Sequence, residues 1–362
     1  MLAIDFVIAV SGILYTVIID SPRLASYMQL LVTYHFGFTR RALVGAIVSG
    51  FTNVVPFWWL HAIAIAAWIV TFILFIAVFR RVFGFSEKNL PLLAFVFGSP
   101  FFFKNFAISL GHFDIFGCLW ALVAFLIPVG PLYPLLIAAG CVGLVLMHNL
   151  HFLLYLPTIG FIVLVRYGLV PGLSTAKVIY GLALIVLVSA IFVATAFFGR
   201  VPVPRETFLA YLKARASVQL DPQNTWMWYS TIPDEIRSTW DHAGITMIRL
   251  PVYAVLIALH IPVARYLKSM ILALPTQSLR TLCIAALAGI SAGYVVIFIV
   301  AYDYSRWVSS WGVCMFLMMH AIRLLPSTGT KDDPPIRPDK TENLVLGWIV
   351  TVIPRVGVTI PF

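Results

Sequence analysis

The sequence predicts an all-α polytopic integral membrane protein, with about eleven transmembrane helices in a single domain over residues 1–362. Two compositional observations predict this class: hydrophobic residues make up 61% of the chain and charged residues only 10%, against roughly a quarter charged residues in soluble domains. The third observation is that the apolar residues fall into long runs bounded by charged residues, proline and glycine. The longest remaining loop has about 50 residues, at the lower limit of domain size, so any active groups must come from helix ends and loops.

In chain order, the apolar runs predict the spans one by one. They lie at 3–19, 57–79, 90–103, 107–128, 132–148, 151–165, 178–198, 247–264, 281–302, 307–324 and 342–356. The first run lacks a basic leader and a small-residue cleavage site, so we expect it to be retained as a helix. Several runs are shorter than the roughly 20 residues of a full crossing, which favours broken or tilted helices there.

Three connecting segments are distinct from these runs. A first extracytoplasmic loop is predicted at 20–56, and its amphipathic, glycine-containing part predicts interfacial or re-entrant helices. A long extracytoplasmic loop follows at 199–246, and the charged, proline-rich segment 325–341 is predicted to be a cytoplasmic linker.

The basic residues predict a cytoplasmic N-terminus. When the spans alternate sides, 12 of the 24 lysines and arginines fall on one side, mostly in short connectors, which is the pattern of cytoplasmic loops. These are Arg80, Arg81, Lys88, Arg166, Lys177, Arg265, Lys268, Arg280, Arg323, Lys331, Arg337 and Lys340. The other twelve fall on the opposite side, so the two counts are equal and the prediction depends on the short connectors. With this orientation the unusual polar groups converge on the extracytoplasmic side.

Two acidic residues, Asp20 and Asp114, are predicted to be catalytic. Asp20 ends the first span, where a carboxylate opposes the helix dipole and needs compensation; the alternative is an interfacial stop followed by an Asx-turn. Asp114 opens the fourth span, and an ionisable group there is costly and by default marks a functional site. The alternative is a buried carboxylate that bonds a neighbouring helix. Because His112 cannot share a helix face with Asp114, we expect Asp114 to work with a group from another loop.

Three arginines, Arg40, Arg41 and Arg306, are predicted to bind a substrate phosphate. Arg40 and Arg41 end the aromatic, glycine-containing stretch 34–41, and arginine binds phosphate with two parallel hydrogen bonds; anchoring to lipid headgroups is the alternative. Arg306 stands three residues after Asp303 in a short Asp-x-x-Arg-Trp connection, so Asp303 can orient it toward a phosphate. The alternative is a surface ion pair of little energetic value.

Three histidines, His112, His148 and His151, are predicted to support the site. His148 and His151 would share a helical face if the helix continues through them. Two such ligands without an adjacent acid do not make a metal site, so both interfacial hydrogen bonding and contacts to substrate hydroxyls or phosphate stay open. The loop 199–246 combines charged with aromatic residues, which suits both a membrane-interface belt and stacking on sugar rings.

Together these elements resemble the GT-C superfamily of polytopic membrane glycosyltransferases. The likeness depends on the acid after the first span, a second acid in Gly111-x-x-Asp114-x-x-Gly117, and a long outer loop in mid-chain. The Gly-Phe-x-Arg-Arg and Asp-x-x-Arg-Trp elements are also similar to membrane proteins encoded among bacterial surface-polysaccharide genes. The resemblance implies an enzyme of the bacterial inner (plasma) membrane that takes a sugar from a polyprenyl-phosphate carrier on the periplasmic or exterior face. It also implies Asp20 as the catalytic base and Asp114 as the second acidic position.

The implied chemistry agrees with the residues present. Inverting glycosyl transfer needs a carboxylate base and cations that stabilise the leaving phosphate. The expected partners are a polyprenyl-phosphate lipid donor, a glycan or glycolipid acceptor and membrane lipids. Nucleic acid is excluded as a partner because the net charge of +10 is dispersed along the chain. No Asp-x-Asp pair is present, so no cofactor is assigned and a divalent cation stays open.

Two other functions stay open. A surface-polysaccharide polymerase or ligase acting on undecaprenyl-pyrophosphate glycans would share the outer arginines, and it predicts loss of function at those arginines with tolerance of aspartate changes. A lipid-linked or small-solute transporter would have charges near the bilayer midplane and internal repeats. The sequence has no convincing repeat, and its charges lie near one face.

Overall fold

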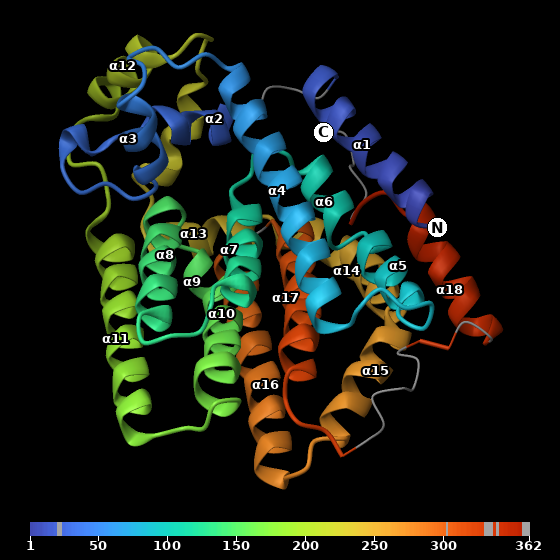
Figure 1. Ribbon diagram of the computed structural model, residues 1–362. Coiled ribbons are helices and arrows are strands. Elements are labelled where there is room, and N and C mark those ends of the chain that lie inside the picture. Colours follow the sequence, from blue (N-terminus) through green and yellow to red (C-terminus); the bar gives the residue numbers. More distant parts are fainter. Residues whose placement is uncertain (20–23, 302, 329–335, 338–339, 357–362) are drawn as a thin grey trace.

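The computed structural model describes residues 1–19, 24–301, 303–328, 336–337 and 340–356, with only the backbone at 243 and 245–247 (Figure 1). All regular structure within these ranges is helical, and the single pairing of extended residues is an isolated bridge between Val55 and Ala216. The predicted all-α class is therefore confirmed for the described part of the chain.

Four of the described spans are long and apolar enough to cross a membrane. They are α4 (Trp58–Val82), the consecutive helices α5 (Leu90–Gly98) and α6 (Phe103–Ile108), α11 (Thr175–Phe198) and α16 (Gln277–Val300). The helices α14 (Ala243–Ala258) and α15 (Ile261–Leu272), bent by 57° at their junction, make a fifth if they are counted as one span. By length and composition, four or five described spans can thus cross a membrane, compared with the eleven expected.

The remaining apolar helices are shorter. They are α1 (Leu2–Ile18), α7 (Asp114–Leu126), α8 (Tyr133–Met147), α10 (Leu156–Val163) with the π turn η2 (Leu164–Leu169), and α18 (Thr341–Val352). The helix α17 (Tyr304–Arg323) runs through the middle of the bundle and is mostly buried (Figure 1). The outer face of α11 is apolar: Ile179, Ile185 and Val186 are 60–67% exposed. Helices that are apolar on all sides and exposed are typical of membrane proteins.

Several helices break inside the predicted spans. The predicted span 90–103 breaks at 99–102, which includes Pro100, and the predicted span 107–128 breaks at 109–113, where Gly111 has a φ of 93°. The break between α8 and the short α9 (His151–Leu154) falls where the predicted spans 132–148 and 151–165 meet, and the predicted span 247–264 breaks just before Pro262. Proline disfavours helical geometry in the residue before it, and a positive φ favours glycine, so proline or glycine accompanies three of these breaks in the sequence.

Two outer segments that are far apart in the sequence fold together into a small layer at one end of the bundle, at the top left of Figure 1. This layer, which we call the cap, consists of residues 24–57 and 200–230. Its helices are α2 (Leu24–Leu31), η1 (Tyr34–Phe36), α3 (Leu43–Ser49), α12 (Arg205–Arg215) and η3 (Pro222–Trp228). The short helices α2 and α3 occupy the segment in which amphipathic or re-entrant helices were expected.

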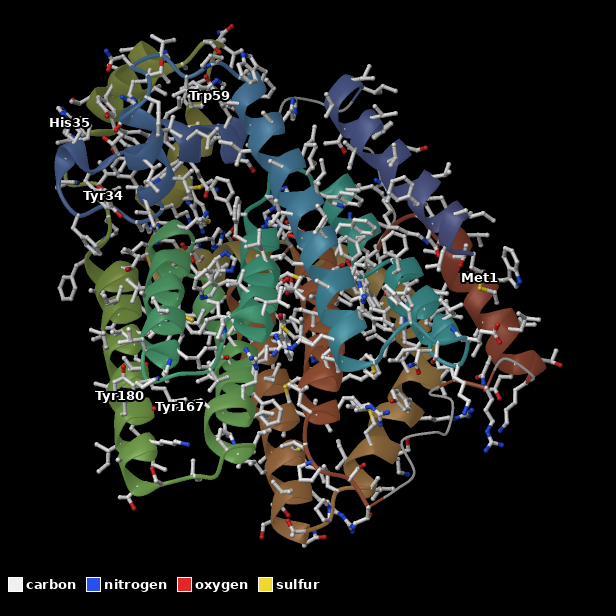
Figure 2. The ribbon with its side chains drawn as sticks, in the orientation of Figure 1. Met1, Tyr34, His35, Trp59, Tyr167 and Tyr180 are labelled. Carbon is white, nitrogen blue, oxygen red and sulfur yellow. The ribbon has the colours of Figure 1, made fainter. Side chains whose placement is uncertain are left out.

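The cap has its own apolar core. Tyr27, Leu212 and Trp228 are fully buried in it, and the Tyr27 hydroxyl donates a hydrogen bond to the Val55 carbonyl. The His35 ring, labelled in Figure 2, stacks on the Tyr211 ring, with the ring centroids 4.8 Å apart. The chain then continues into α13 (Ile232–Asp241), which packs against α16. Most of the predicted linker 325–341 lies outside the described residues.

Candidate functional site

The candidate site lies where the first turns of α7 and α17 meet. Asp114 is the first residue of α7, Asp303 immediately precedes α17, and Arg306 is in the first turn of α17. Arg306 Nη2 and Nε lie 2.6 and 2.8 Å from Asp114 Oδ2, and Arg306 Nη1 lies 3.0 Å from Asp303 Oδ2. One guanidinium therefore joins two carboxylates through charge-assisted hydrogen bonds, which fix its plane.

The second oxygen of Asp114 is left free by this arrangement. Asp114 Oδ1 is buried and has no hydrogen-bond partner among the residues that the structure describes. Asp114 also lines a small cavity of about 10 Å³ together with Ser109, Gly111 and His112, roughly the room that one water molecule needs. A carboxylate that is held through one oxygen and free at the other can accept a proton from a small group in such a cavity.

The two glycines around Asp114 each have a structural reason. Gly111, with its φ of 93°, forms the turn that leads into α7, a conformation that side chains other than glycine rarely adopt. A Cβ on Gly117 would lie 2.2 Å from Tyr155 Cδ2 and 2.9 Å from His151 Nδ1. Glycine at this position therefore lets α9 and α10 approach α7 closely.

His148 and His151 do not share a helical face, because the helix does not continue through them. Helix α8 ends at Met147, and His148 is extended, with φ −157° and ψ 105°. The chain turns before α9, and the two rings still come to lie 5.8 Å apart, both buried. His148 Nδ1 and both ring nitrogens of His151 have no hydrogen-bond partner of normal geometry in the described part of the chain, although the Phe113 backbone lies beside the His151 ring.

Arg41 supplies a positive charge that forms no ion pair with any carboxylate the structure describes. Its backbone has a φ of 60°, which is uncommon outside glycine and is often found at functional sites. Its Nη1 contacts Met227 Sδ at 3.2 Å, and its buried Nε has no partner within the described ranges. Burial lowers the pKa of Arg41 to about 10, and the charge of Arg40 acts in the same direction. Arg41 therefore stays protonated at pH 7, near enough to Arg306 and Asp114 to feel their charges.

Arg40, next to it, is bonded within the cap. Its Nη2 donates to the Ser230 carbonyl and hydroxyl, both at 2.8 Å, and its Nη1 lies 3.4 Å from Glu235 Oε1. The Trp228 indole donates to the Arg40 carbonyl at 3.0 Å. Burial lowers the pKa of Arg40, and the Glu235 carboxylate partly opposes this shift. In this structure Arg40 cross-links the two segments of the cap.

The structure thus places the residues expected from the sequence in three groups. Asp114, Asp303 and Arg306 are in direct contact, and Arg41, His112, His148 and His151 surround them. Arg40 is joined to Ser230 and Glu235 instead. Asp20 lies outside the described residues.

Two residues near this site were not expected. Arg249 and Tyr253 of α14 lie close enough to one another to interact electrostatically. Tyr253 is also close enough to interact with Asp303 and Ser305. Arg249 Nε is buried and has no partner in the described residues. The signal was available in the sequence, because Arg249 is a lone cation inside the predicted span 247–264, and such charges are functional candidates.

A second buried polar group lies apart from this site. Lys104 Nζ is 2.8 Å from Asp5 Oδ1, and both side chains are 0% exposed. The ammonium also donates to the carbonyls of Gly98 at 2.8 Å and Thr351 at 2.6 Å, so the pair joins α1, α5, α6 and α18. The sequence signal was again a charge within or beside an apolar run.

Within the described residues, no three histidine, cysteine, aspartate or glutamate side chains lie close enough together to hold a metal ion. The fold and the site together define a helical protein of membrane type with a buried carboxylate–guanidinium centre beneath an aromatic cap. Comparisons of the chain with protein-family models, with curated proteins and with solved structures find no match. Its function is therefore argued from the geometry of this centre.

Proposed function

We propose that the chain is a membrane glycosyltransferase of the GT-C type. It moves a sugar from a polyprenyl-phosphate-linked donor to a hydroxyl of a glycan or glycolipid acceptor. The observation that carries the proposal is the state of Asp114: Arg306 holds one of its oxygens, the other oxygen is buried without a hydrogen-bond partner among the described residues, and the residue lines a small cavity. A fixed carboxylate with one free oxygen is suited to be a general base.

The proposed reaction gives each charged group of the site a role. Asp114 Oδ1 accepts the proton of the acceptor hydroxyl, the hydroxyl oxygen bonds to the anomeric carbon, and the bond from that carbon to the phosphate oxygen breaks. The electron pair leaves with the phosphate, whose charge the uncompensated Arg41 stabilises. Arg306 and Asp303 hold Asp114 in position, and His148 and His151 contact substrate hydroxyls. Asp20 is the alternative base.

The proposed setting is the bacterial inner membrane, with the site and the cap on the periplasmic or exterior side. The chain would cross about eleven times, with the shorter apolar helices taking part in tilted or broken crossings. The donor would reach the site sideways from the bilayer. No cofactor is assigned. The requirement for a divalent cation is tested in the same assay as the sugar transfer.

Sugar transfer by the purified protein in lipid vesicles tests this proposal, with a polyprenyl-phosphate sugar as the donor. We expect Asp114→Asn or Asp20→Asn to lower the rate by about 10²- to 10⁴-fold, the usual contribution of a general base. Glu87→Gln, in the exposed connection between α4 and α5, is the control and should keep full activity. Thermal unfolding of each variant separates loss of chemistry from loss of folding. Full activity in both aspartate variants would rule out this mechanism.

A polysaccharide polymerase or ligase is the first rival function. It predicts that Arg41→Gln abolishes activity while Asp114→Asn and Asp20→Asn are tolerated, and that whole glycans are transferred. Asp114→Asn separates this rival from the glycosyltransferase, because it removes the base but keeps a polar partner for the Arg306 guanidinium.

One observation favours the transporter rival. The buried Asp5–Lys104 pair lies beside the break between α5 and α6, and a 2.8 Å hydrogen bond between Ser99 and His260 joins this break to the one between α14 and α15. Broken helices and buried charges are typical of ion-coupled transporters. Movement of an unmodified sugar lipid across sealed vesicles, dependent on Lys104 and independent of Asp114, would favour this rival.

A further inference from the structure

A large apolar groove lies among α8, α10, α11 and α16. Its volume is about 790 Å³, and it is open on one side. Most of its lining is leucine, isoleucine, valine and phenylalanine, with Lys177 as its single charged residue. Tyr167 of η2, which lines the groove, is labelled in Figure 2. Protein interiors are close-packed, so an apolar volume of this size indicates a binding site.

Three of the four helices around the groove have a glycine in its lining. Gly160 of α10, Gly181 of α11 and Gly289 of α16 line it, and a Cβ added to any of the three would meet no atom within 4 Å. Each of the three helices thus has its smallest residue where a larger apolar side chain would fit without a clash. The groove therefore exists because of these residue choices, and helix packing alone does not require it.

The charge at one end of the groove favours an anionic ligand. Lys177 Nζ donates to the carbonyls of Gly172 at 2.8 Å and Tyr167 at 3.1 Å and lies 5.1 Å from the centre of the Tyr167 ring. No carboxylate forms an ion pair with it among the described residues. An ammonium has three donors, so one remains for a ligand. Basic pockets between membrane helices bind anionic lipid headgroups.

The length of the groove matches one leaflet of a bilayer. From Lys177 to Ser189, which both line the groove, α11 rises about 18 Å at roughly 1.5 Å per residue. Half of the hydrocarbon core is about 15 Å thick. A phospholipid with its phosphate at Lys177 would therefore lie along the groove with its acyl chains ending near Ser189. The basic connectors place Lys177 on the cytoplasmic side, where anionic lipids are enriched.

We propose that the groove among α8, α10, α11 and α16 binds an anionic phospholipid. Lys177 holds the phosphate, and the acyl chains lie over Gly160, Gly181 and Gly289. This inference does not depend on the proposed sugar transfer, because the glycines and the lysine would hold the same lipid in a protein of either rival function.

Lipid retention by the purified full-length protein tests the inference. The protein is exchanged into vesicles of phosphatidylglycerol and phosphatidylcholine in equal parts and extracted into detergent, and its retained lipids are counted by native mass spectrometry. We expect phosphatidylglycerol to be retained preferentially. Lys177→Gln should lower this preference about fivefold, since one lysine near a lipid surface contributes about 1 kcal/mol, whereas Lys177→Arg should keep it. Lys268→Gln, an exposed lysine of α15, is the matched control.

A second pair of variants tests the groove itself. Gly181→Phe should displace the lipid from the groove, whereas Gly244→Phe, in α14 with nothing within 4 Å of its added Cβ, should retain it. Equal retention of both lipids by the wild type, or an unchanged preference in Lys177→Gln, would overturn the inference. Recovery of a polyprenyl phosphate in place of the phospholipid would overturn it as well. The lysine variants keep the inference testable if Gly181→Phe does not fold.

Discussion

Asp114 and Asp5 are both buried carboxylates, but their surroundings differ. Asp5 faces an ammonium that is itself held by backbone carbonyls, and the pair connects four helices. Asp114 is bound by Arg306 through Oδ2 alone, and its Oδ1 is free beside a cavity. Neither Asp5 Oδ1 nor Asp114 Oδ1 has a hydrogen bond of normal geometry in the described part of the chain, but Asp5 Oδ1 lies 2.8 Å from the Lys104 ammonium, whereas no cation forms an ion pair with Asp114 Oδ1 there. A buried carboxylate oxygen against a cation is typical of a structural role, and one without a cation is typical of a reactive role. This difference is why we place the chemistry at Asp114.

At the residue scale, Lys104→Met should be strongly destabilising, because it leaves the Asp5 carboxylate buried without its partner. Removing one member of a buried ion pair typically costs about 3–5 kcal/mol of unfolding free energy. The double variant Asp5→Leu with Lys104→Met should recover most of this loss, since no unpaired charge remains. Thermal or denaturant unfolding in detergent measures both. A single variant as stable as the wild type would show that the pair contributes little.

At the scale of elements, the site depends on helices that begin or break at the same level. Asp114 starts α7, Arg306 lies in the first turn of α17, and His148 lies in the break before α9. Polar side chains at helix ends can meet without interrupting the backbone hydrogen bonds of a bundle. Gly117 contributes to this arrangement by allowing Tyr155 and His151 to lie against α7.

We therefore expect Gly117→Ala to disturb the site. The added Cβ would overlap Tyr155 and push α9 and α10 away from α7, and such overpacking typically costs about 1–3 kcal/mol of unfolding free energy. Gly143→Ala in α8 is the control, because its nearest neighbour would be 4.0 Å from the added Cβ and alanine favours a helix over glycine. The measurement is the unfolding temperature together with the activity. Equal stability of the two variants would contradict the close approach.

At the scale of the whole molecule, the cap joins two distant segments over one end of the bundle, and the basic connectors lie at the other end. Arg40, Trp228 and Ser230 join the two segments of the cap, and this junction presents Arg41 to the site. The proposed orientation puts the cap outside the cell and Lys177, Lys268 and Arg280 inside.

Cysteine labelling tests this orientation. Glu206→Cys in α12 of the cap and Lys268→Cys in α15 both replace exposed side chains, whereas the four native cysteines are buried. In intact cells we expect a membrane-impermeant thiol reagent to label position 206, and to label position 268 only after permeabilisation. Labelling of both positions in intact cells, or the reverse pattern, would contradict the proposed topology.

The sequence by itself determined the helical class and the apolar character of the helices, and it singled out Asp114 and Arg306 as candidates, because bilayer-type composition and isolated charges in or beside apolar runs are local properties of the chain. It did not determine the break at 99–102, the role of Arg40 as a cross-link, or the Asp5–Lys104 pair. Those features depend on contacts between residues far apart in the chain, such as the hydrogen bond from Arg40 to Ser230, 190 positions away. Only the tertiary structure decides which buried charge meets which partner, because pairing energy depends on distance and burial in three dimensions.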